Sequence, residues 1–190
     1  MFSAYFELGF RHITDLNAYD HMLFLLALIC IYQVIDIKKI LVLITAFTLG
    51  HSVTLILATT KLIRINNDWV EFLIPVTILI TAVVNIWRGK RGGGNMFWPY
   101  FFAAFFGLIH GLGFSNYLLM LLSREKDVFF PLLAFNLGIE VGQIIIVAVI
   151  LLLSVIAFQL FRFKHRDWIL VLSGAAAGIA IVLIKEAIFW

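Results

Sequence analysis

The side chains best suited to chemistry in this sequence are histidines and acids placed in or beside strongly apolar segments. The stretch "RHITDLNAYDH" holds His12, Asp20 and His21 directly ahead of an apolar run. Two further histidines, His51 in "FTLGHSVTL" and His110 in "FGLIHGLGF", lie inside apolar segments. Neutral imidazole together with carboxylate suits borderline divalent ions such as nickel, cobalt or zinc. The chain has a single cysteine, so a thiolate site for a soft metal is not indicated.

A third polar pattern occurs in the segment "FNLGIEVGQ". Asn136, Glu140 and Gln143 are spaced i, i+4, i+7, and these positions share one face of a helix. A carboxylate at mid-bilayer costs about 2.5–3.5 kcal/mol, so it must be protonated, paired or bound to a cation. The basic Lys185 lies near the end of another apolar segment and could extend to the membrane surface. We therefore expect Glu140 to join the histidines as a metal ligand.

These residues sit in a chain whose composition is that of an integral membrane protein. The 190 residues are 63% hydrophobic and only 13% charged, with a mean hydropathy of +1.06. A soluble domain of this size needs a far more polar surface. The net charge of +3 therefore bears on membrane topology and does not indicate a nucleic-acid partner. We expect one integral membrane domain over residues 1–190, with the lipid bilayer as its surroundings.

Hydropathy predicts an all-α bundle of about six transmembrane helices. A helix needs about 20 apolar residues to cross the hydrocarbon core. Residues 2–12 carry a weak signal for a short interfacial helix ahead of the first span. The five tryptophans all fall at predicted span ends, as an interfacial aromatic belt would place them. The predicted spans are 20–36, 39–60, 69–87, 97–122, 129–160 and 168–190.

The distribution of lysine and arginine predicts the orientation. The loops after the first, third and fifth spans hold eight basic residues, against five on the opposite side. The larger set should be cytoplasmic, which places both termini outside. In this topology Asp20, His21 and Glu71 open spans at the outer surface. His51 and Glu140 lie deeper, so the polar groups trace a path from the outer face towards the midplane.

Small residues recur at four-residue spacing in the later spans. Such pairs let helices approach closely in lipid, and they serve either packing within one subunit or contacts in a homo-oligomer. The sequence leaves these two roles open, with packing the commoner one. The pairs are Gly107/Gly111, Gly138/Gly142 and Gly174/Gly178.

One histidine inside a membrane is more often a hydrogen-bonding group than a ligand. Two such histidines with a carboxylate at similar depth, and a further histidine at the entrance, favour a functional site. We predict a metal site whose ligands come from His12, Asp20, His21, His51, His110 and Glu140. Ser52, Glu71, Asn136 and Gln143 are predicted to support these ligands.

Five motifs in order resemble those of the HupE/UreJ family of small bacterial membrane proteins. They are "H…YDHMLFLLAL", "FTLGHSVTL", "VEFLI…N", "FGLIHGLGF" and "FNLGIEVGQ", and they cover most of the chain to about residue 145. The resemblance implies a permease of the bacterial inner membrane that is associated with hydrogenase and urease, with nickel as the usual substrate. The Asp-His pair is also similar to that of nickel–cobalt transporters.

Two functions from different classes remain open. The first is a permease or facilitator for a divalent transition metal, driven by a gradient or the membrane potential because no P-loop is present. The second is an intramembrane zinc hydrolase acting on a lipid or a membrane peptide, since three protein ligands and one open position make a catalytic zinc site. In that enzyme Asp20 or Glu140 would be the general base. A metal sensor or assembly factor without transport is a third reading.

Overall fold

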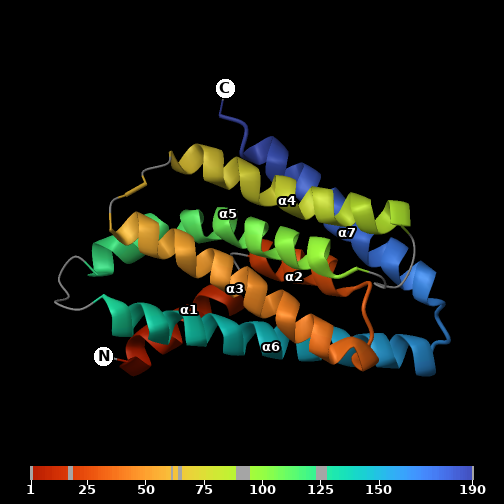
Figure 1. The fold of residues 1–190 in the computed structure, drawn as a ribbon. Helices are drawn as coiled ribbons and strands as arrows, with labels where there is room; N and C mark the ends of the chain where they lie inside the picture. The colour runs from red at the N-terminus through yellow and green to blue at the C-terminus, as the bar shows by residue number, and fades with distance from the viewer. Residues whose placement is uncertain are drawn as a thin grey trace.

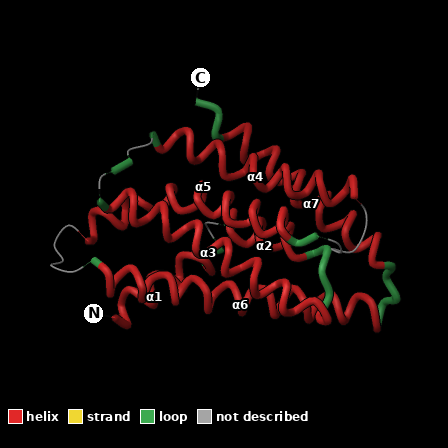
Figure 2. The backbone as a smooth tube through the Cα atoms, viewed as in Figure 1, coloured by secondary structure: helices red, strands yellow, loops and turns green. Residues whose placement is uncertain are grey.

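A computed structural model describes residues 2–16, 19–60, 62–63, 66–88, 95–122 and 128–189. This part of the chain contains helices and loops only, as Figure 2 shows, so the predicted all-α class is confirmed. The helices are α1 (Phe2–Thr14), α2 (Asp20–Ile29), the 3₁₀ turn η1 (Val34–Asp36), α3 (Ile37–Thr59), α4 (Asn67–Arg88), α5 (Phe97–Leu122), α6 (Phe129–Gln159) and α7 (His165–Glu186).

Five of these helices, α3 to α7, are long and apolar enough to cross a membrane. Their bounds agree with the last five predicted spans to within a few residues, and the chain is an integral membrane protein. Helix α6 has 31 residues without a break, which makes it about 46 Å long, so it must tilt or project beyond the bilayer. Trp190 lies outside the described residues.

The first predicted span, residues 20–36, is not one continuous helix. Helix α2 has only ten residues, and the chain after it turns through an extended Gln33 into η1. The carboxylate of Asp36 accepts a hydrogen bond from the Gln33 backbone N–H, which helps to fix this turn. Ten residues cover about 15 Å, roughly half of the hydrocarbon thickness.

Helix α1 supplies the missing half. Gly9 lies against the backbone of Phe135, and Gly138 lies against the backbone of Phe6, so α1 runs alongside the first part of α6. This differs from the expected surface helix because two glycines without a β-carbon let the backbones meet. Helix α2 then packs near Val147 on the later part of α6. Figure 1 shows α1 and α2 following one another along the bundle, and we interpret the pair as a membrane crossing that is broken between the two helices.

A second close pair joins α3 to α5. Gly107 faces the backbone of Phe47, and Gly111 faces His51 and Thr54, so the two helices run in the same direction. The prediction that the glycine pairs serve packing therefore holds for α5 and α6. In α7 the result differs, since a β-carbon added at Gly174 or Gly178 would meet no atom within 4 Å.

The bundle has two distinct ends. The N-terminus and the first turns of α4 and α6 lie at one end, with the last turns of α3 and α5, and we call this the N-terminal end (Figure 1). The opposite end carries η1, Arg88 and the segment between α6 and α7, which includes Arg162 and Lys164. We call it the basic end, and the distribution of positive charge predicts that it faces the cytoplasm.

The contact between α3 and α5 gives a test of the fold. Replacing Gly107 by alanine places a β-carbon on the carbonyl oxygen of Phe47, and the helices must move apart. We expect a loss of about 1–3 kcal/mol and a thermal midpoint in detergent lowered by about 3–10 °C. Gly174→Ala is the matched control, since its β-carbon enters open space and should leave the midpoint unchanged or raised. Equal midpoints for both variants would contradict this packing.

Candidate metal centre

Three histidines from three helices meet where the first membrane crossing is broken. His12 lies in the last turn of α1, His21 in the first turn of α2, and His51 in α3. One ring nitrogen from each lies within 4.8 Å of the other two. Two nitrogens on one ion lie at most about 4.2 Å apart, because metal–nitrogen bonds are about 2.0–2.1 Å. Small rotations of the rings would therefore complete a shared coordination sphere. We call these residues the histidine triad.

Four ring nitrogens of the triad are buried without a hydrogen-bond partner in the described part of the chain. His51 is fully buried and His21 is 4% exposed. Among the described residues, no partner reaches the Nε2 atoms of His12 and His21 or either ring nitrogen of His51. An unsatisfied buried polar group costs about 1–3 kcal/mol. Since a neutral imidazole has one acceptor nitrogen and one N–H, a metal ion would satisfy one of the two unpaired nitrogens of His51.

Asp20 orients one of these rings. Its Oδ1 accepts the backbone N–H of His21 at 2.9 Å and lies 3.0 Å from the Nδ1 of the same residue. The carboxylate favours a proton on Nδ1, which leaves the lone pair on Nε2 available to a metal ion. Asp20 was predicted as a ligand, and in the structure its carboxylate contacts the ring of His21.

His110 stands next to the triad. Its ring centroid lies 5.3 Å from that of His21, and it is fully buried in α5. Its Nδ1 lies 2.8 Å from the carbonyl oxygen of Phe106, which can only accept a hydrogen bond. The proton is therefore on Nδ1, and Nε2 is available and without a partner among the described residues. The ring of His110 thus lies beside the triad, outside the group of nitrogens that lie within 4.8 Å of one another.

The structure does not bring Glu140 into the triad. The hydroxyl of Thr45 donates to its Oε1 at 2.7 Å, and Thr48 donates in the same way to Gln143. Asn136 has an unpartnered Oδ1. Ser52 donates to the backbone oxygen of Thr48, so its hydroxyl is engaged away from the rings. The pairs Thr45–Glu140 and Thr48–Gln143 therefore form a separate group between α3 and α6.

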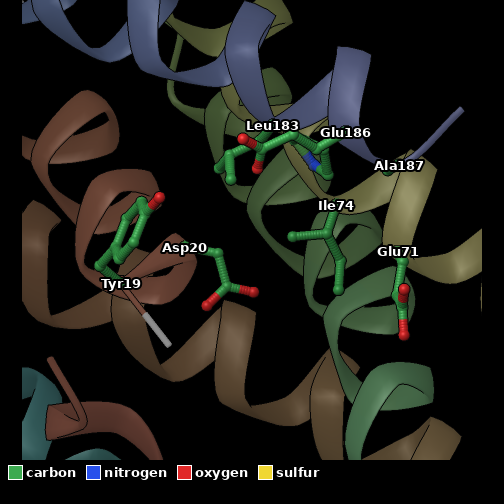
Figure 3. Close-up of a pocket in the computed structure, with 8 residues that line it drawn as sticks. Tyr19, Asp20, Glu71, Ile74, Leu183, Glu186 and Ala187 are labelled. Atoms are coloured by element: carbon green, nitrogen blue, oxygen red, sulfur yellow. The ribbon is translucent and has the colours of Figure 1, made fainter. Parts of the chain in front are cut away.

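Acidic residues surround an open cavity of about 600 Å³ on one side of the triad. Figure 3 shows Asp20 pointing into this cavity, with Glu71 and Glu186 on the helices across from it. Glu71 is exposed and was predicted to lie near the entrance. Glu186 was not predicted to line the cavity. Its position near the end of the last span, on the same predicted side as Glu71, would have indicated it. A further open cavity of about 580 Å³ includes His12 and Asp15 in its lining.

An aromatic wall closes the other side of His110. Phe24, Phe47 and Phe106 are all buried. The ring of Phe24 is stacked on that of Phe47, with centroids 4.9 Å apart, and meets that of Phe106 edge-on at 6.0 Å. The rings of Phe24 and Phe47 lie 5.0 and 5.1 Å from that of His110. Phenylalanines in an apolar helix give no sequence signal, so this wall was not predicted. It separates the histidines from the part of the bundle nearer the basic end.

The comparison with known families covers almost the whole chain. The family described as "HupE / UreJ protein" matches residues 1–188. No match was found among curated proteins or among solved structures. A match of this extent includes every helix and all four clustered histidines. The chain therefore belongs to the HupE/UreJ family.

Proposed function

We propose that this protein is a permease or facilitator for a divalent transition metal, with nickel as the substrate that the family association favours. The observation that carries the proposal is the histidine triad, whose unpartnered nitrogens lie at the break between α1 and α2. Transporters commonly bind their substrates near the midplane at such discontinuous helices. The open cavities beside His12 and Asp20 give an ion access to this depth.

The cation enters from the N-terminal end, which the charge distribution predicts to be outside. The carboxylates around the cavity beside Asp20 attract it and replace part of its hydration shell. The ion then binds the nitrogens of His12, His21 and His51, with His110 as an additional donor. A membrane potential of 100 mV supplies about 2.3 kcal/mol per charge, or about 4.6 kcal/mol for a divalent cation that crosses completely. This is sufficient to drive uptake without a nucleotide.

The ligand set determines which metals are selected. Imidazole suits nickel, copper and zinc, whereas magnesium, calcium and manganese prefer oxygen ligands. Because the nitrogens are uncharged, the site discriminates by ligand chemistry and not by charge alone. Cytosolic and periplasmic magnesium would therefore compete poorly for the triad.

A zinc hydrolase is the second candidate, and the contact between Asp20 and His21 favours it. Three imidazoles, one of them oriented by a carboxylate, fit a resident zinc ion, and the cavity beside Asp20 leaves room for substrate. In this reading His12, His21 and His51 would hold the ion, which supplies a water activated for hydrolysis. The two functions differ in how long the protein keeps its metal.

Substitution of the triad tests the site itself. We expect His51→Ala to weaken nickel binding by more than about 100-fold, because it removes a direct ligand. Asp20→Asn should weaken binding about 10- to 100-fold, since it removes only the charge that orients His21. Isothermal titration calorimetry on the purified protein measures both. His165→Ala is the control, because His165 starts α7 at the basic end and lies outside the triad. Unchanged binding in His51→Ala would refute the triad as the nickel site.

A second prediction separates transport from catalysis. The wild-type protein in proteoliposomes should carry nickel to an indicator trapped inside, and both His51→Ala and His110→Ala should abolish that flux. The purified protein should lose its metal to a mild chelator within minutes. Near-stoichiometric zinc that resists chelation, together with no flux, would favour the hydrolase. Flux that survives both substitutions would exclude this path for the ion.

A further inference from the structure

A line of polar side chains continues from the histidine triad between α3 and α6. On α3, Thr48 and Thr45 precede His51 by three and six residues, which places them about 4.5 and 9 Å nearer the basic end. They donate hydrogen bonds of 2.7 Å to Gln143 and Glu140 of α6. We call these four residues, together with Asn136, the polar seam.

The polar seam begins on α6 near the depth of the triad. The ring of Phe135 is stacked 6.4 Å from that of His51, and Asn136 is the next residue along α6. Glu140 follows one turn later and Gln143 about one further turn. The seam therefore leads from the depth of the triad towards the basic end.

The polar atoms of the seam are only partly satisfied. Gln143 is fully buried, and its Nε2 has no partner among the described residues, while the Oδ1 of Asn136 is equally unpartnered. If the amide of Gln143 turns by half a rotation, its nitrogen donates to Thr48 and its oxygen becomes the free atom. Glu140 is half-buried, and the hydrogen bond given for its carboxylate comes from Thr45. Oxygen acceptors with too few donors at membrane depth form a suitable environment for a cation.

The other route from the triad towards the basic end is blocked. Phe24, Phe47 and Phe106 lie between the histidines and that end on the side of α2 and α5. A divalent ion passing through that aromatic wall would lose all its ligands. Over the same distance towards the basic end, the polar seam offers a cation hydroxyl, amide and carboxylate oxygens.

We propose that the polar seam is a second cation station, formed mainly by oxygen ligands, through which the divalent ion leaves the histidine triad. Glu140 supplies the negative charge, and Thr45, Gln143 and Asn136 supply neutral oxygens. This inference rests on the proposed function as a permease. Borderline metals bind imidazole nitrogen more firmly than neutral oxygen, so the seam holds the ion less tightly than the triad and favours its release.

The test measures nickel binding and nickel transport separately in the same variants. Glu140→Gln keeps the size of the side chain and an acceptor for Thr45, and removes the charge. Nickel binding to the purified protein, measured by calorimetry, should stay within about twofold of wild type because the triad is intact. Nickel flux in proteoliposomes should fall at least about tenfold. His51→Ala, by contrast, should lose both binding and flux.

Two further variants complete the experiment. Ser154→Ala is the control on α6, since the Ser154 hydroxyl is buried but donates to the backbone of Leu151, away from the seam, and its flux should match wild type. Thr45→Val removes the hydroxyl and conserves the volume, so it should lower nickel flux and leave nickel binding intact. This variant tests the seam if Glu140→Gln does not fold.

Each contrary outcome has a distinct meaning. Wild-type flux in Glu140→Gln and Thr45→Val would overturn the seam as a route. Loss of equilibrium binding in Glu140→Gln to the level of His51→Ala would overturn it as a separate station, because Glu140 would then belong to the triad. If the wild-type protein binds nickel and carries no flux, the permease function itself fails, and the seam has no role in transit.

Discussion

The constraint that organises this molecule is the absence of water inside the bilayer, where a polar atom must find a partner in the protein or in a bound ligand. The rings of His12, His21 and His51 lie close together, and among the described residues no partner reaches the Nε2 atoms of His12 and His21 or either nitrogen of His51. In the proposed function, an ion that accepts nitrogen lone pairs would satisfy these atoms at the break between α1 and α2.

Glycine contacts position the parts of the centre. Gly9 and Gly138 allow α1 to lie against α6, which brings His12 to the depth of His21. Gly107 and Gly111 hold α5 against α3, so His110 reaches the same region as His51. Backbone-to-backbone packing of this kind tolerates little displacement, because any added β-carbon would collide with the neighbouring helix. The ligand positions are therefore set by helix packing far more than by the loops, and the connection between α1 and α2 only has to bridge two fixed helix ends.

Much of this arrangement follows from the sequence, and the rest depends on three-dimensional contacts. Helix length and hydropathy predict α3 to α7, and the residue types identify all four histidines of the centre. Hydropathy could not reveal the broken first crossing, because α1 has too few residues to register as a span and its role depends on backbone contact with α6. The partner of Glu140 could not be predicted either. Its position along α6 indicates its depth in the membrane, but only the structure shows that it accepts a hydrogen bond from Thr45 and lies outside the triad.

The separation of nitrogen from carboxylate ligands has a physical consequence for a transporter. If Glu140 were inside the triad, its charge would strengthen binding of every dication, including abundant magnesium and calcium, and would weaken discrimination. In the proposed permease, carboxylates at the cavity of Asp20 on one side and Glu140 on the other would attract the ion at both approaches, while the uncharged triad between them would select by ligand type. Selectivity and attraction would then be provided by different residues.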